Sequence, residues 1–141
     1  MNEGYILEQV GIRMVKEPPL YSTEPINTPE AAVRIMAETL RKFDREVLCV
    51  VNLQNDLKPI NMNVVSIGTL NQSLAHPREI LKSIVLSNAG SVMLMHNHPS
   101  GELQPSKEDI ALTDRMQKIC TLLGVPILDH IIIGNSDRYY S

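Results

Sequence analysis

A chain of 141 residues, with 43% hydrophobic and 21% charged residues, has the composition of one globular domain that can bury a core of its own. Aromatic residues make up only 4% and there is no tryptophan, which argues against stacking platforms for single-stranded nucleic acid. The net charge is −3 without a basic run, which argues against duplex nucleic acid as a partner but leaves room for a local basic patch.

The first 27 residues form the least regular part of the sequence. Residues 12–16 have the apolar content of a short edge strand, and the prolines at positions 18, 19 and 25 break the segment that follows. We therefore expect residues 1–27 to be an arm that lies on the domain, and residues 28–141 to be that domain.

Helices and strands alternate over the rest of the chain. Thr28 can cap a helix that begins at Pro29, while Gly124 and Pro126 end the last helix. The apolar patterns predict helices over 29–43, 77–88 and 106–123, and strands over 46–53, 59–67, 91–96 and 127–133. The strand over 46–53 is apolar on both faces, as is typical of a central strand. This order predicts an α/β fold with a mixed sheet.

The two cysteines, Cys49 and Cys120, lie far apart and within apolar patterns. We expect them to be buried free thiols in a reducing compartment, and not a disulfide or metal ligands. The sequence shows neither a signal-peptide core nor an apolar segment of membrane-spanning length. We therefore expect a cytoplasmic location without a membrane partner.

Two histidines stand at the end of the strand predicted over 91–96. His96 and His98 are separated by one residue, so they share one face of an extended backbone, and Pro99 stops the strand directly afterwards. Two imidazoles on one face can bind a single metal ion. The spacing alone is equally compatible with metal binding and with two hydrogen-bonded histidines in the core or at the surface.

Asp109 adds a third potential ligand. Its helical position falls within the stripe that faces the core, which comprises Leu112, Met116, Cys120 and Leu123. A carboxylate directed at the core needs a partner, and a metal ion would provide one. Ser106 and Asp109 also match a capping box, a competing explanation that leaves the Ser106 hydroxyl free to face the site. Three protein ligands would leave one coordination position open, as in catalytic zinc sites.

Hydrolysis at such a centre requires a carboxylate close to the metal but not bound to it. Glu46 is the best candidate, because it stands where the apolar strand over 46–53 begins. Its alternative is a surface acid at a strand end. Glu79, Glu102 and Glu108 are less suited, since they fall on a polar helix face, in a loop and at the edge of the inward stripe.

The pattern His-x-His, seven residues, then Ser-x-x-Asp, with a glutamate upstream, resembles the signature of the JAMM (JAB/MPN+) zinc metallopeptidases. The surrounding residues resemble the RadC-like JAB domain more closely, over about residues 28–135. The matching segments are 76–79, 96–101, 105–109 and 128–130.

This resemblance implies a deaminase-like α/β/α sandwich and Zn²⁺ as cofactor. His96, His98 and Asp109 would hold the ion with water as the fourth ligand. Glu46 would act as general base and Ser106 would stabilise the oxyanion. The implied activity is that of a peptidase or isopeptidase acting on a peptide or protein substrate.

Two other functions stay open at this point. The first is an interaction module of the same fold without turnover, in a DNA-repair or mobile-element complex, in line with the repair label of the RadC name. The second is a zinc nuclease with salt-dependent DNA binding. Typical RadC proteins carry an N-terminal helix-hairpin-helix region, whereas we expect only about 27 residues before the first helix here, which argues against a DNA role tied to that region. The sequence leaves homo-oligomerisation and other metals open, and it assigns no role to Asp129 or His130, for which burial at a strand start is expected.

Overall fold

One five-stranded mixed sheet forms the centre of the domain in this computed structural model, which describes residues 4–67, 76–134 and 139–140. The strand order is β2-β1-β3-β4-β5. Strand β1 is antiparallel to β2 and β3, β3 is parallel to β4, and β5 is antiparallel to β4. The strands are β1 (Val47–Leu53), β2 (Pro59–Ile67), β3 (Ser91–Asn97), β4 (Ile127–Ile133) and β5 (Tyr139–Tyr140).

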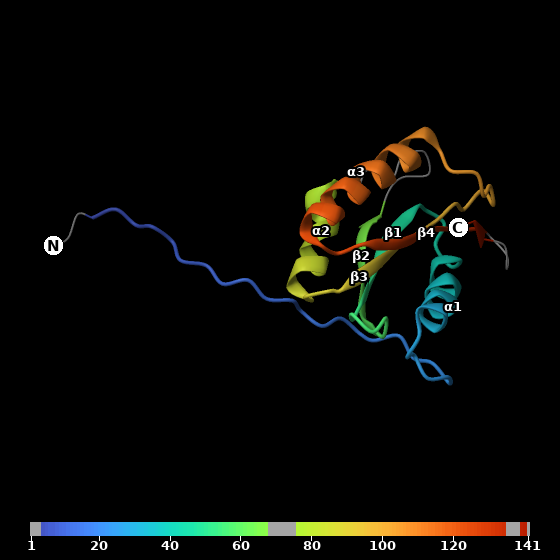
Figure 1. Cartoon of the computed structure of the whole chain (residues 1–141), viewed down its shortest axis with the longest axis horizontal. Coiled ribbons are helices and arrows are strands. Elements are labelled where there is room, and N and C mark those ends of the chain that lie inside the picture. The colour runs from blue at the N-terminus through green and yellow to red at the C-terminus, as the bar shows by residue number, and fades with distance from the viewer. Residues whose placement is uncertain (1–3, 68–75, 135–138, 141) are drawn as a thin grey trace.

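Three helices cover the two faces of this sheet. They are α1 (Pro29–Leu40), α2 (Pro77–Leu86) and α3 (Lys107–Leu123). Helix α1 lies on one face, and α2 and α3 lie on the other (Figure 1). The predicted α/β/α sandwich with a mixed sheet is therefore confirmed. Both faces of β1 are covered, so all seven of its residues are buried, as expected for a central strand.

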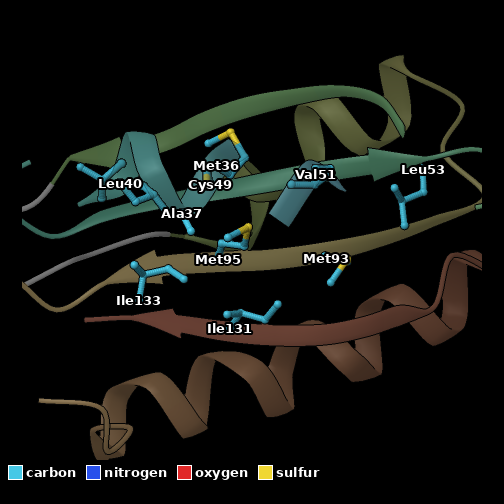
Figure 2. Close-up of a cluster of buried hydrophobic side chains, with 12 residues drawn as sticks. Met36, Ala37, Leu40, Cys49, Val51, Leu53, Met93, Met95, Ile131 and Ile133 are labelled. Carbon is cyan, nitrogen blue, oxygen red and sulfur yellow. The ribbon is translucent and has the colours of Figure 1, made fainter. Parts of the chain in front are cut away.

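Each face of the sheet contributes alternate residues to its own apolar cluster. On the α1 face, Met36 and Leu40 pack against odd-numbered residues of β1, β3 and β4, among them Cys49 and Met95 (Figure 2). On the other face, even-numbered strand residues such as Leu94 pack against α2 and α3. His96 belongs to this second series, so it points toward the layer that contains α3.

The helix ends follow the capping residues. Thr28 accepts a hydrogen bond from the Ala31 N–H at the start of α1. Helix α1 ends at Leu40, three residues before the predicted end, because the next N–H groups tighten into a short turn on Thr39 and Leu40. Gly124 ends α3 in the left-handed conformation with a φ of 74°.

Residues 4–27 contain no helix or strand, so the edge strand predicted over 12–16 is wrong. A strand gains stability only when a neighbouring edge accepts its hydrogen bonds, and these residues pair with none of the described strands. The first part of the arm runs away from the domain (Figure 1), with Tyr5 and Leu7 fully exposed, so it does not lie on the domain as expected. Within the described residues, Met14 contacts Ser87 across 3.6 Å.

Among the described residues, none of the helices combines the length and apolarity needed to cross a bilayer. Cys49 and Cys120 are free and buried, as expected. The inward stripe of α3 is confirmed for Met116 and Cys120, which are fully buried, whereas Leu123 in the last turn is 49% exposed.

Candidate metal centre

His96 and His98 leave the end of β3 on the same face. His96 is paired with Leu48 of β1 and with Ile132 of β4, which fixes its backbone inside the sheet. The His98 N–H donates to the Ile133 carbonyl at 2.9 Å, so the extended backbone continues one residue past the strand. The chain then turns at Gly101, whose φ is 84°. Both imidazoles are buried and directed toward the start of α3.

Asp109 reaches the histidines from the first turn of α3. The Ser106 hydroxyl accepts from the Asp109 N–H at 3.0 Å, and Asp109 Oδ2 accepts from the Ser106 N–H at 2.9 Å. This is a complete capping box. The same oxygen lies 3.2 Å from His98 Nε2 and 3.3 Å from His96 Nε2. Capping and ligation, which the sequence posed as competing explanations, are thus compatible in one carboxylate.

The three donor atoms have the spacing that a small cation requires. His96 Nε2 lies 2.9 Å from His98 Nε2, so the triangle completed by Asp109 Oδ2 has sides of 2.9, 3.2 and 3.3 Å. A tetrahedral centre with bonds of about 2.1 Å separates its ligands by about 3.4 Å. Among the described residues these three form the group that could hold a metal ion. The donor set therefore fits zinc.

Hydrogen bonding fixes which nitrogen of His98 faces the other donors. His98 Nδ1 lies 2.7 Å from the Glu102 carbonyl, which can only accept, so Nδ1 carries the hydrogen. The neutral ring then directs the lone pair of Nε2 at Asp109. When the ring is protonated, its Nε2–H donates to Asp109, and this hydrogen bond raises the pKa of His98. The site therefore attracts positive charge.

The carboxylate of Asp109 responds to the same contacts. Burial acts to raise the pKa of Asp109, but the hydrogen bonds that the protonated rings of His96 and His98 donate, together with that of the Ser106 N–H, outweigh it and hold the pKa well below its usual range. Asp109 is consequently ionised, as a metal ligand must be.

Glu46 lies beside this triangle but outside it. Its Oε1 is 3.8 Å from His98 Nε2, and its side chain is 21% exposed. A single water molecule can bridge groups at such a distance. The structure does not bring the side chains of the three rejected glutamates to the site in the same way: Glu79 pairs with Lys82 on α2, Glu102 contributes its backbone carbonyl, and Glu108 is exposed.

Ser106 stands at the rim of the same site. It is exposed, and its oxygen accepts the helix-capping hydrogen bond from Asp109. A hydroxyl that accepts one hydrogen bond still has a hydrogen to donate. Its predicted role at an oxyanion stays a prediction.

Two residues without a predicted role lie directly behind His96. His130 Nε2 is 2.8 Å from His96 Nδ1, and Thr113 Oγ1 is 2.5 Å from His130 Nδ1. Burial and the neighbouring His96 lower the pKa of His130 to about 4. His130 lies in the middle of β4, so it is not merely buried at a strand start. The spacing of Thr113, four residues after Asp109 on one helix face, is the sequence signal that could have identified it.

A cavity of about 370 Å³ opens beside the donors, between α3 and β4. Its walls include His96, Asp109, Ile110, Thr113, Leu128 and His130. The volume lies within the range of small-ligand sites. The candidate metal centre is thus accessible from one side through a partly apolar cleft.

A three-layer α/β/α domain with imidazole and carboxylate donors converging at the end of a central strand defines a class of protein with a candidate mononuclear metal centre. The chain belongs to the RadC-like JAB domain family, whose model matches residues 26–141. The resemblance drawn from the sequence motifs is therefore confirmed.

Relatives of this family occur in several bacteria. The chain is 40% identical over 133 residues to a UPF0758 protein of Desulfitobacterium hafniense, which covers 94% of this chain and 58% of that protein. It is 40% identical over 115 residues to a UPF0758 protein of Clostridium acetobutylicum, covering 82% and 50%. For a UPF0758 protein of Actinobacillus pleuropneumoniae the identity is 36% over 139 residues, covering 99% and 59%. The chain thus spans between 50% and 59% of the length of these relatives.

Proposed function

We propose that this domain is a zinc-dependent hydrolase that cleaves peptide or isopeptide bonds in a protein or peptide substrate. The observation that carries the proposal is the position of Glu46 Oε1, 3.8 Å from a ligand nitrogen, beside three donors that leave a coordination position open. A bound zinc ion would lower the pKa of a water molecule at that position to ~7 and polarise the scissile carbonyl.

His96, His98 and Asp109 would hold the ion, and Glu46 would move the proton. Its carboxylate accepts the proton of the attacking water and then delivers it to the leaving amine. The hydroxyl of Ser106 has a hydrogen available for the oxyanion that develops on the substrate carbonyl. The cleft between α3 and β4, whose walls include His96 and Asp109, would give the substrate a route to the metal site.

The two free thiols support the proposed compartment. Cys49 and Cys120 are buried and free, a state that persists in a reducing environment. A cytoplasmic location is therefore part of the proposal.

The test compares zinc content and turnover in three proteins: wild type, Glu46→Gln and Glu108→Gln. Glu108→Gln is the matched control, because it removes an exposed carboxylate near the same helix terminus. Cleavage is followed with a quenched fluorescent peptide library and with isopeptide-linked peptides. We expect about one zinc per chain in all three proteins, and turnover at least ~10²-fold lower in Glu46→Gln alone.

Two results would contradict the proposal. If the zinc-loaded wild type cleaves neither substrate class faster than Glu46→Gln, the domain is an interaction module without turnover. If the wild type instead cleaves DNA in a zinc-dependent manner, the bond class is wrong and the domain is a nuclease.

A further inference from the structure

We propose that Thr113 and His130 form a positioning relay that fixes the tautomer and orientation of His96, so that its Nε2 presents a lone pair to the metal. The inference rests on the metal site of the proposed function and adds two residues that act on a ligand from behind. Both act through His96, because His130 contacts Nδ1 of His96 and Thr113 contacts His130.

The relay begins at the Thr113 hydroxyl, which has one hydrogen. We assign that hydrogen to the Asp109 backbone carbonyl at 2.9 Å, an oxygen that can only accept. Thr113 Oγ1 then accepts from its second partner, Nδ1 of His130 at 2.5 Å. In this assignment His130 carries its hydrogen on Nδ1.

The tautomer of His130 in turn determines the tautomer of His96. A neutral His130 with its hydrogen on Nδ1 has a lone pair on Nε2, which lies 2.8 Å from His96 Nδ1. His96 Nδ1 must then donate, so the lone pair of His96 is on Nε2. That nitrogen is the one directed at His98 and Asp109. The hydrogen-bond order thus prepares His96 for a cation before any cation binds.

The two histidine ligands differ in how firmly their tautomers are set. His98 donates to the Glu102 backbone carbonyl, and a carbonyl cannot change from acceptor to donor. His96 instead donates to an imidazole, which has two neutral tautomers. Which neutral tautomer His130 adopts therefore depends on Thr113, a side chain of helix α3.

If the Thr113 hydroxyl is removed, the tautomer of His130 should no longer be fixed. Without an acceptor at Nδ1, His130 can place its hydrogen on Nε2 and donate to His96 Nδ1. His96 would then carry its hydrogen on Nε2, where it blocks metal binding. Removal of such supporting partners typically weakens metal binding 10–100-fold.

The experiment measures zinc affinity by competition with a chromophoric chelator in Thr113→Val, Thr113→Ser and Thr121→Val. Thr121 is the matched control: its hydroxyl bonds to the Gln117 carbonyl at 2.7 Å, one turn apart on the same helix and away from the site. We expect affinity to fall at least ~10-fold in Thr113→Val, to be restored in Thr113→Ser and to be unchanged in Thr121→Val.

A second readout needs neither zinc nor substrate. Long-range ¹⁵N–¹H spectra of the imidazoles in the metal-free protein report which ring nitrogen carries the hydrogen. We expect His96 to carry it on Nδ1 in the wild type and to lose this preference in Thr113→Val. If Thr113→Val does not fold, His130→Gln and His130→Leu replace it: the glutamine oxygen can accept from His96, so we expect only the leucine variant to lose zinc affinity.

The outcomes separate the relay from the proposed function. Unchanged zinc affinity in Thr113→Val, or an Nε2–H tautomer of His96 in the metal-free wild type, overturns the relay. A wild type that binds zinc but cleaves no peptide overturns the proposed function and leaves the relay standing on its own spectra.

Discussion

The side chain of Asn97 holds the main chain on both sides of Glu46. Its Oδ1 accepts from the Val47 N–H at 2.7 Å, and its Nδ2 donates to the Arg45 carbonyl at 2.9 Å. Asn97 is 2% exposed and stands between His96 and His98, with its side chain on the opposite face of the strand. The residue between the two histidines therefore fixes the backbone of the proposed base.

Replacing Asn97 with alanine should uncouple the base from the ligands. The Val47 N–H, which is buried, and the Arg45 carbonyl would lose their partners, so we expect the free energy of unfolding to fall by about 1–3 kcal/mol. Turnover should fall while zinc stoichiometry stays at the wild-type value. Urea denaturation and metal analysis measure the two effects, with Asn63→Ala on the edge strand β2 as control. Equal loss of zinc and turnover in Asn97→Ala would show that the amide supports the ligands instead.

Asp109→Asn separates ligation from capping. The asparagine oxygen can still accept from the Ser106 N–H, so the helix cap is preserved, whereas the negative charge is lost. We expect zinc binding to be lost with a change of less than about 1 kcal/mol in the unfolding free energy measured with a chelator present. Full zinc occupancy in Asp109→Asn would mean that the carboxylate serves only the helix.

Cys49 should make the protein sensitive to alkali. Burial raises the pKa of its thiol from 9.0 to about 12, so between these values the unfolded chain loses a proton that the folded chain retains. Fewer protons on the unfolded state mean that stability falls as pH rises through this window. At pH 10 the effect is on the order of 1 kcal/mol.

The measurement compares urea midpoints at pH 8 and pH 10 for wild type and Cys49→Ala. Cys49→Ala should lose less stability over this interval than the wild type. Equal losses would assign the alkaline effect to other groups. Native Cys49 should also resist thiol reagents until the domain unfolds.

Gly90 should tolerate no side chain. A β-carbon at this position would lie 2.2 Å from Oδ1 and 2.8 Å from Cα of Asn55, so the backbone of the β1–β2 turn would have to move. Gly90→Ala should lower the unfolding free energy by about 1–3 kcal/mol in a thermal or urea titration. Gly11→Ala, where the added carbon meets nothing within 4 Å, is the control and should leave stability unchanged.

The elements that the sequence predicted well are those whose signals are local. Thr28 and Gly124 carry the information for helix ends in their own conformations, and the apolar run of β1 predicts a central strand. The convergence of His96, His98 and Asp109 could also be predicted, because one strand spacing and one helix stripe place these three side chains on facing surfaces.

The features that escaped prediction depend on contacts between distant segments. The pairing of His96 with His130 joins residues 34 positions apart through the parallel register of β3 and β4. The hydrogen bond that holds the backbone beside Glu46 joins Asn97 to Arg45, 52 positions away. Neither of these two contacts can be derived from the periodicity of the sequence. The strand predicted over residues 12–16 of the arm was wrong for a related reason: alternating apolar residues indicate a strand only when a sheet edge is available to pair with it.

The most direct test of the metal centre is an anomalous difference map recorded at the zinc edge from crystals grown with zinc. We expect one peak bonded to His96 Nε2, His98 Nε2 and an Asp109 carboxylate oxygen, with Glu46 close to the ion but outside its ligands. A peak at another place, a fourth side chain in the open position, or Glu46 bound to the ion would contradict a hydrolytic centre built in this way.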